Sequence, residues 1–202
     1  MDAMTARQLE LLTRMSRLFP PVRIMGGYAE DALVAGTVTR PHVDVDWLFP
    51  RRESELRLEQ ARALGFHHFD VVGEAAPGQP FYLYGESNGL KLELGVLDEE
   101  DDGLWVKICS LALVIDGKPA PVGYRVAMPN DTFEHPPAAI DGITVWPISP
   151  LALYQMRVGI ARQGSFGRLT EKQLRSRRRL KEAFFPDRSN EELLPRIEHL
   201  PP

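Results

Sequence analysis

The sequence predicts an α+β fold, in which a mixed β-sheet carries helices on one face and the C-terminal part is helical. Three observations lead to this prediction. Helical and strand-like runs alternate near the start of the chain, short strand-like runs follow in hairpin-like order, and the end is helical. The change from strand to helix divides the chain into a core at 1–147 and a C-terminal helical region at 148–202.

The beginning of the chain is predicted to form a helix, a strand and a second helix. Residues 3–18 place apolar side chains at helical spacing, and a pair of prolines ends that helix because proline lacks a backbone N–H. Residues 22–25 form a short strand, and residues 28–34 form the next helix. Gly26 and Gly27 lie between them, at a turn from strand to helix.

The middle of the chain is predicted to be rich in strands. Residues 44–49 are strand-forming, and residues 51–64 form a helix that ends at a glycine. Residues 81–84 and 90–96 are expected to pair as a hairpin. The strongly apolar run 104–115 adds one or two further strands.

The end of the chain carries the start signals of three helices. Ser149 is a good N-cap and Pro150 a good first residue for a helix that is apolar around most of its surface. After a loop, Thr170 and Gln173 have the spacing of a capping box for a second helix. Ser189 opens a last short helix.

The composition is that of a soluble protein with one sizeable domain. The 202 residues are 44% hydrophobic, and the net charge of −4 gives no basic excess of the kind that indicates a nucleic-acid partner. The single cysteine, Cys109, has no partner for an internal disulfide. No apolar run approaches the roughly 18 residues of a membrane span and no signal peptide is visible, so we expect a cytoplasmic protein without a membrane partner.

Two carboxylates in the strand at 44–49 are the first candidate for a functional site. Asp44 and Asp46 are two positions apart, so their side chains point to the same face of the strand. They repel each other unless a cation lies between them, and Mg²⁺ commonly binds one or two carboxylates together with substrate phosphates. Gly26 and Gly27 let backbone N–H groups approach an anion closely, and the following helix adds partial positive charge.

The stretch GGYAEDALVAGTVTRPHVDVD, which begins at Gly26 and ends at Asp46, resembles a known family signature. Gly-Gly, a helix and Asp-x-Asp on the next strand are similar to the polymerase-β-like nucleotidyltransferase superfamily. With Thr-Arg-x-His in between, the stretch looks most like aminoglycoside 2″-nucleotidyltransferases and related lincosamide nucleotidyltransferases. Tyr28 replaces their usual Trp and one extra residue precedes Gly36. The resemblance covers roughly residues 22–50.

The resemblance implies a nucleotidyltransferase core at 1–147 that transfers AMP from ATP to a hydroxyl of a small molecule. An aminoglycoside-like antibiotic is the candidate acceptor. Asp44 and Asp46 would hold Mg²⁺ and take part in catalysis, and superfamily members carry a third carboxylate on a nearby strand. Glu93 is the candidate for this third metal ligand and for the general base, because it is the acid inside the run 90–96. The implied nucleotide-binding residues are Gly26, Gly27, Arg40 and His42.

Several alternatives stay open at this point. One is a regulatory or toxin–antitoxin-type protein of the same fold that acts on tRNA or protein, and another is a catalytically degenerate binding protein. If Glu93 is neither a metal ligand nor the general base, we expect it to be an exposed strand residue in a salt bridge. The acids at 98–102 form either a solvated loop or the rim of an acceptor site that attracts a cationic substrate. The arginine cluster at 175–179 is a solvated face or a phosphate site, and the C-terminal helices complete the acceptor pocket, cap the core or form a homodimer interface.

Overall fold

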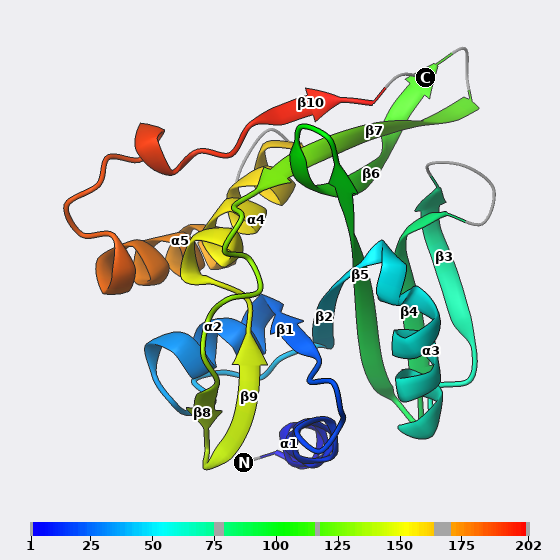
Figure 1. Cartoon of the computed structure of the whole chain (residues 1–202), viewed down its shortest axis with the longest axis vertical. Coiled ribbons are helices and arrows are strands. Elements are labelled where there is room, and N and C mark those ends of the chain that lie inside the picture. Colours follow the sequence, from blue (N-terminus) through cyan, green and yellow to red (C-terminus); the bar gives the residue numbers. More distant parts are fainter. Residues whose placement is uncertain (1, 75–78, 116–117, 164–170, 201–202) are drawn as a thin grey trace.

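The computed structural model describes residues 2–74, 79–115, 118–163 and 171–200, in which helices flank a mixed β-sheet (Figure 1). The predicted α+β class is confirmed. The loop predicted after residue 163 and the predicted capping residue Thr170 lie outside the described residues.

The helices follow the predicted order and differ from the prediction at their ends. The first helix stops before residue 18, and the helix predicted from residue 51 begins with a 3₁₀ turn. No described helix is long and apolar enough to cross a membrane. The helices are α1 (Ala3–Met15), α2 (Gly26–Val34), η1 (Arg51–Glu53), α3 (Ser54–Ala63), α4 (Pro150–Gln163), α5 (Glu171–Phe184) and η2 (Glu191–Leu193).

The strands include the predicted ones and two short additions, the hairpin strand β8 and the C-terminal strand β10. The strands are β1 (Arg23–Met25), β2 (Val45–Pro50), β3 (Phe69–Glu74), β4 (Pro80–Ser87), β5 (Leu90–Glu100), β6 (Gly103–Ile115), β7 (Lys118–Met128), β8 (Ala138–Ile140), β9 (Ile143–Pro147) and β10 (Ile197–His199). Because β10 pairs with β7, the C-terminal region returns to the sheet and is not wholly helical. The division of the chain at residue 147 stays a prediction.

The sheet is mixed, and β2 lies in its interior. The main path runs β10-β7-β6-β5-β2-β1-β9-β8, while β4 pairs with β5 and β3 pairs with β4. β2 is parallel to β5 and antiparallel to β1. The register places Asp46 beside Glu93 on β5 and beside Met25 at the end of β1. This register brings the predicted third carboxylate next to the Asp-x-Asp pair.

Neighbouring residues of β2 serve opposite faces of the sheet. Trp47 is fully buried, and its indole N–H donates a hydrogen bond to the sulfur of Met15 on α1 at 3.4 Å. Arg14 of α1 in turn donates to the backbone oxygen of Ala63, which links α1 to the C-terminal end of α3. Because side chains alternate along a strand, Asp46 faces away from Trp47 and α1. The hydrophobic core therefore anchors the strand from one face and leaves the carboxylates on the other.

The hairpin between β4 and β5 is tighter than the predicted connection at 85–89. Ser87 pairs directly with Leu90, which leaves a two-residue turn. The turn residues Asn88 and Gly89 have φ angles of +50° and +76°. Asn-Gly is the preferred pair for a turn that needs two positive φ angles, so both strands extend to the turn.

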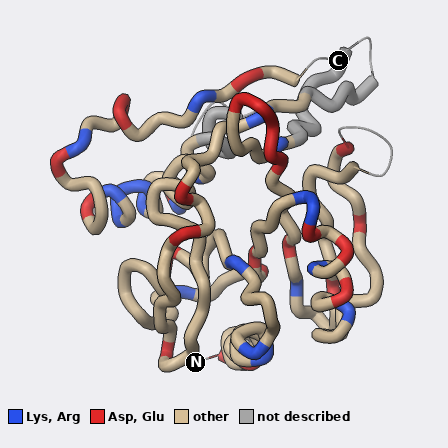
Figure 2. Tube along the Cα trace, in the orientation of Figure 1, with Lys and Arg blue, Asp and Glu red and all other residues tan. Residues whose placement is uncertain are grey.

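The prediction of a solvated acidic loop at 98–102 is wrong for residues 98–100, which belong to β5, whereas Asp101 and Asp102 are exposed in the turn that follows. β5 continues to Glu100, and Asp98 is buried. Figure 2 shows the acidic residues at this end of β5 and basic residues near them. Asp98 is paired with Arg51 and Lys107, Glu99 with Arg52, Glu100 with Lys107 and Arg125, and Asp102 with Arg125 and Arg196. These ion pairs compensate the charges of residues 98–100, which allows this part of the acidic run to lie in β5.

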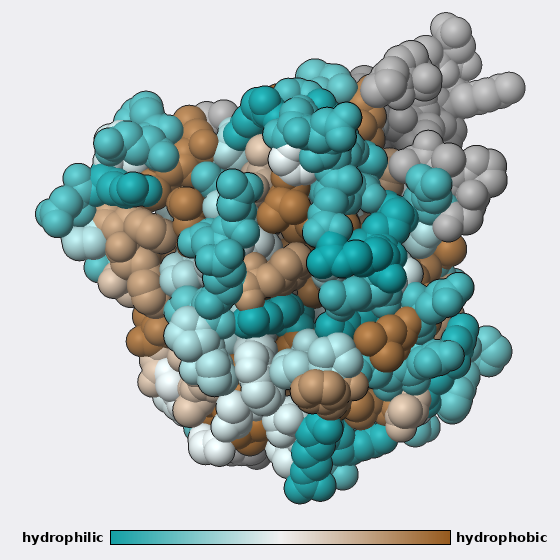
Figure 3. Space-filling model, in the orientation of Figure 1, coloured by the Kyte–Doolittle hydropathy of each residue, from teal (hydrophilic) through white to brown (hydrophobic). Residues whose placement is uncertain are grey.

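The surface visible in Figure 3 is mixed, with hydrophobic patches among hydrophilic side chains. The large apolar side chains are mostly inside, in one cluster that joins α1, α2 and α4 to β1, β2 and β5. Among the described residues, exposed large hydrophobic side chains are few and include Phe19, Val43 and Val71. The core that supports β2 is therefore continuous beneath the carboxylate face.

Replacing Trp47 by alanine should lower the free energy of unfolding by about 3–5 kcal/mol, because a fully buried ring and its hydrogen bond to Met15 are lost. Urea denaturation followed by circular dichroism measures this change. Val71→Ala on β3 is the control, since this side chain is 52% exposed and its loss should cost less than about 1 kcal/mol. Equal losses in the two variants would contradict the anchoring role of Trp47.

Candidate active site

The turn from β1 into α2 is built from the two predicted glycines. The helix begins at Gly26 and not at residue 28, so both glycines belong to its first turn. Gly26 has a φ of +68°, and a Cβ atom there would lie 1.6 Å from the Oδ2 atom of Asp46. A Cβ atom on Gly27 would lie 2.2 Å from the Nδ1 atom of His42. Only glycine lets this turn lie directly against the carboxylate and the imidazole.

Asp44, Asp46 and Glu93 form a carboxylate cluster. Asp44 lies just before β2, Asp46 lies within it, and Glu93 lies beside Asp46 on β5. One carboxylate oxygen from each residue can be chosen so that all three atoms are within 4.8 Å of one another. Three carboxylates at this spacing are the donor set that hard divalent cations such as Mg²⁺ prefer. The structure therefore brings together the three predicted metal ligands.

Crowding and burial change the proton affinities of the cluster. Burial, followed by the charges of Asp44 and Glu93, raises the pKa of Asp46 well above its ordinary value. Burial, followed by the charge of Asp44, raises the pKa of Glu93 to about 7. The Arg157 guanidinium and a hydrogen bond from the Gly27 backbone oppose the rise at Asp46. The repulsion among the three carboxylates is only partly compensated, and a bound cation would relieve it.

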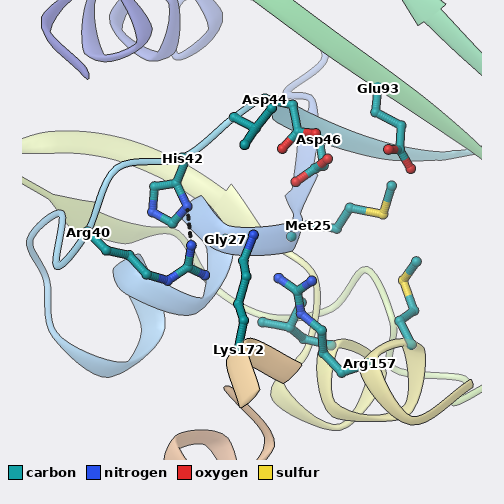
Figure 4. A pocket seen from close by; sticks show the side chains of 13 residues that line it. Met25, Gly27, Arg40, His42, Asp44, Asp46, Glu93, Arg157 and Lys172 are labelled. Atoms are coloured by element: carbon teal, nitrogen blue, oxygen red, sulfur yellow. Dashed lines mark hydrogen bonds between the residues drawn. The ribbon is translucent and has the colours of Figure 1, made fainter. Parts of the chain in front are cut away.

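The cluster forms one wall of a pocket of about 180 Å³. All seven site residues predicted from the sequence line this pocket, whereas the acidic residues 98–102 do not. Figure 4 shows the carboxylates on one side, with Arg40, Arg157 and Lys172 directed into the same space from other elements. The lining residues are Met25, Gly26, Gly27, Arg40, His42, Val43, Asp44, Asp46, Glu93, Leu153, Met156, Arg157 and Lys172. The pocket thus joins an anionic wall to a cationic one.

The sequence did not identify Arg157 and Lys172. Arg157 lies in α4, and its Nε atom is buried without a hydrogen-bond partner among the described residues. An arginine in a largely apolar helix was the available signal, since buried cations need a partner. Lys172 lies in the first turn of α5, and nothing local distinguishes it from a surface lysine. Only the packing of α4 and α5 against the sheet shows that both face the carboxylates.

His42 and Arg40 are held by the protein. The Nδ1 atom of His42 lies 3.1 Å from the Nη1 atom of Arg40, and its Nε2 atom lies 2.8 Å from the Oδ2 atom of Asp31. The ring also contacts Tyr28, with 4.3 Å between ring centroids. Both ring nitrogens of His42 are therefore occupied within the protein, while Arg40 lines the pocket. Their predicted roles toward a nucleotide stay predictions.

The arginine cluster at 175–179 does not act as one surface. Arg175 and Arg178 are exposed. Arg177 lies over the ring of Tyr154, with its Cζ atom 5.5 Å from the ring centroid, and Arg179 pairs with the buried carboxylate of Glu30. The cluster is therefore partly a solvated face and partly a set of contacts between α5 and the rest of the fold.

Metal-free protein should become less stable as the pH rises from about 5 to about 8, because folding raises the pKa of Glu93 from 4.5 to about 7. Between these values the folded carboxyl holds a proton that the unfolded one has released, so rising pH favours unfolding. Glu93→Gln removes this loss and, in EDTA at pH 8, should exceed the wild type in stability by about 1–3 kcal/mol.

Thermal unfolding of both proteins at pH 5 and pH 8 measures the effect, and the difference between them should shrink at pH 5. Mg²⁺ at pH 8 should stabilise the wild type more than Glu93→Gln, because a carboxylate ligand is missing from the variant. A variant that is less stable than the wild type at pH 8 in EDTA would contradict the raised pKa.

No protein-family model matches the chain, and a search of curated proteins gives no match. A crystal structure of ANT(2″)-Ia in complex with adenylyl-2″-tobramycin matches with a TM-score of 0.61 and 19% sequence identity, covering 95% of this chain and 93% of that one. A solution structure of the antibiotic-resistance factor ANT(2″)-Ia gives the same TM-score and identity, covering 96% and 89%.

The structural match extends well beyond the stretch that carried the resemblance in sequence. That stretch covers roughly residues 22–50, whereas the superposition covers almost the whole chain. At 19% sequence identity, the property that the two chains share is the fold. The chain has the aminoglycoside nucleotidyltransferase fold seen in ANT(2″)-Ia.

Proposed function

We propose that the protein is a Mg²⁺-dependent nucleotidyltransferase that transfers AMP from ATP to a hydroxyl of an aminoglycoside-like acceptor. The observation that supports it best is the meeting of the Asp44, Asp46 and Glu93 carboxylates with the Gly26-Gly27 turn at one pocket. The fold shared with ANT(2″)-Ia adds support. A phosphoryl-transfer site needs anionic metal ligands beside cationic phosphate contacts, and this pocket combines the two.

The carboxylate cluster fits Mg²⁺, because its donors are all oxygens and their repulsion is incompletely compensated. Asp44 and Asp46 would be the ligands, with Glu93 within reach of the same ion. Bound Mg²⁺ would neutralise charge on the triphosphate and on the leaving pyrophosphate. β2 fixes the backbone of Asp46, and the Gly27 backbone N–H donates to its carboxylate.

Three cations would bind the triphosphate. Arg157 from α4, Arg40 and Lys172 all line the pocket, and the unpartnered Nε atom of Arg157 supplies a donor that a phosphate oxygen would satisfy. Planar guanidinium groups bind phosphates through paired donors. These contacts would fix the α-phosphorus beside the carboxylate cluster, which is the positional requirement for in-line transfer.

Glu93 would accept the proton of the acceptor hydroxyl. The acceptor oxygen forms a bond to the α-phosphorus, the bond from this phosphorus to the bridging oxygen breaks, and pyrophosphate leaves. The proton moves from the hydroxyl to the Glu93 carboxylate, which lies at the edge of the cluster on β5. Atoms and charge balance in this single displacement.

The choice of acceptor rests on two observations. The carboxylate wall attracts a positively charged substrate, and ANT(2″)-Ia is seen with adenylyl-2″-tobramycin. The acidic residues 98–102 lie outside the pocket lining, and Asp98, Glu99, Glu100 and Asp102 are ion-paired within the fold. A polycationic aminoglycoside fits better than a lincosamide, which carries much less positive charge.

Pyrophosphate release with Mg²⁺-ATP should be stimulated by aminoglycosides such as tobramycin and far less by lincosamides or simple sugars. Stimulation by another hydroxyl compound alone would reject the acceptor and keep the reaction. AMP transferred to tRNA or protein instead would favour the regulatory alternative.

Asp46→Asn should reduce turnover by about 10²–10³-fold or more while the protein stays folded, since one charge of the metal site is lost. The matched control is Asp101→Asn, because Asp101 is an exposed carboxylate in the turn after β5. Turnover and thermal unfolding are measured for both variants. Near-wild-type turnover of Asp46→Asn would reject the metal site.

Arg157→Met should lower kcat/KM for ATP by about tenfold to a hundredfold, because a triphosphate contact is removed. Arg175→Met, at an exposed position on α5, serves as the control and should change little. Steady-state kinetics with varied ATP give the comparison. If both variants behave alike, Arg157 does not contact the nucleotide.

A further inference from the structure

Two carboxylates of α2 are buried beneath the pocket without lining it. Glu30 and Asp31 are consecutive residues, and their exposed fractions are 1% and 0%. A buried charge is costly unless cations and hydrogen-bond donors surround it. The groups that compensate these two carboxylates therefore show what the pair holds together.

On one side the pair binds α5. The Nη1 atom of Arg179 lies 3.0 Å from the Oε1 atom of Glu30 and 3.3 Å from the Oδ1 atom of Asp31. The hydroxyl of Ser176, one turn earlier on α5, donates to the Oε2 atom of Glu30. Two side chains thus attach this part of α5 to α2. Arg179 contacts both carboxylates, and the Ser176 hydroxyl donates to Glu30.

On the other side the pair binds the segment that carries Arg40. The Oδ2 atom of Asp31 accepts from the backbone N–H of Thr39 at 2.9 Å and lies 2.8 Å from the Nε2 atom of His42. Arg40 has donors only, so the Nδ1 atom of His42 accepts from Arg40 and Nε2 carries the proton that points to Asp31. Arg40 donates to His42, and His42 donates to Asp31.

We propose that Arg179 is a positioning residue for Arg40, acting through Glu30, Asp31 and His42. This inference rests on the proposed function, in which Arg40 binds the triphosphate of ATP. Arg179 does not line the pocket, so it acts on the nucleotide only through these intermediates. The role of α5 extends beyond Lys172, because through Arg179 it also sets the place of a second cation that lines the pocket.

The distances show why Arg179 matters to Arg40. The Nη2 atom of Arg40 lies 4.0 Å from the Oε2 atom of Glu30, at the limit of an ion pair. While Arg179 compensates Glu30, Arg40 keeps its hydrogen bond to His42 and its place at the pocket. Without Arg179, Glu30 is a buried carboxylate in need of a cation, and Arg40 is close enough to turn toward it. The triphosphate then loses a donor.

Kinetics with Mg²⁺-ATP and an acceptor test this mechanism. Arg179→Ala should raise KM for ATP about tenfold and leave KM for the acceptor within about twofold. Arg178→Ala, at the preceding exposed position on α5, should leave both values unchanged. Adding Glu30→Gln to Arg179→Ala should return KM for ATP toward the wild-type value, because the neutral amide no longer attracts Arg40.

The rescue separates positioning from mere support of the fold. If Arg179 only supported the fold, Arg179→Ala would reduce the active fraction and the melting temperature with KM unchanged, and Glu30→Gln would restore nothing. An unchanged KM for ATP, or a raised KM without rescue, overturns the inference. If Arg179→Ala does not fold, Arg179→Lys replaces it, with a smaller rise in KM and the same rescue expected.

A ligand-free measurement distinguishes failure of this inference from failure of the proposed function. The proposed function fails if the wild type neither binds nor turns over Mg²⁺-ATP. In protein with ¹⁵N-labelled histidine, Arg179→Ala should shift both ring-nitrogen resonances of His42, and Arg178→Ala should not. Unshifted His42 resonances in Arg179→Ala overturn the inference in either case.

Discussion

Asp44, Asp46 and Glu93 repel one another, and the elements around them hold the three carboxylates together despite this repulsion. The parallel pairing of β2 with β5 forces two of these carboxylates to be neighbours, and burial sharpens their mutual repulsion. Several features offset it: the Trp47 contact with α1 holds the strand from behind, the Gly27 N–H faces Asp46, and Arg157 approaches from α4. The fold tolerates an unfavourable arrangement here because its large core supplies the stability.

Local patterns were sufficient to predict the part of the site that is close in sequence. Gly26, Gly27, Asp44 and Asp46 lie within one turn-helix-strand unit, so their spacing indicated that they converge. Arg40, His42 and a third carboxylate were implied by the family resemblance, and Glu93 was chosen for the third carboxylate because it is the acid inside the run 90–96. Arg157 and Lys172 could not be predicted, since their approach depends on how α4 and α5 pack against a distant part of the sheet.

The incorrect prediction at residues 98–102 has the same physical cause, because the contacts that decide the structure there come from residues far away in the sequence. A run of five acids is repulsive on its own, and sequence reasoning places such a run in solvent. Here cations from η1, β6, β7 and the segment before β10 pair with the run, so β5 extends into it as far as Glu100. Its partners Arg51, Lys107, Arg125 and Arg196 are scattered along the chain, and only the assembled sheet brings them together. Long-range ion pairing thus decided a local secondary structure.

The site also crosses the boundary expected at residue 147, since the sheet supplies the carboxylates and the C-terminal helices supply Arg157 and Lys172. The glycines at the β1–α2 turn have a different kind of consequence. They bear no functional group, yet any Cβ at Gly26 or Gly27 would collide with Asp46 or His42. Any side chain at these two positions would therefore displace a site residue, so a saturation-mutagenesis scan scored by ligand binding would find both glycines as intolerant as the acids, for a steric reason that adds to any contact made by their backbone N–H groups.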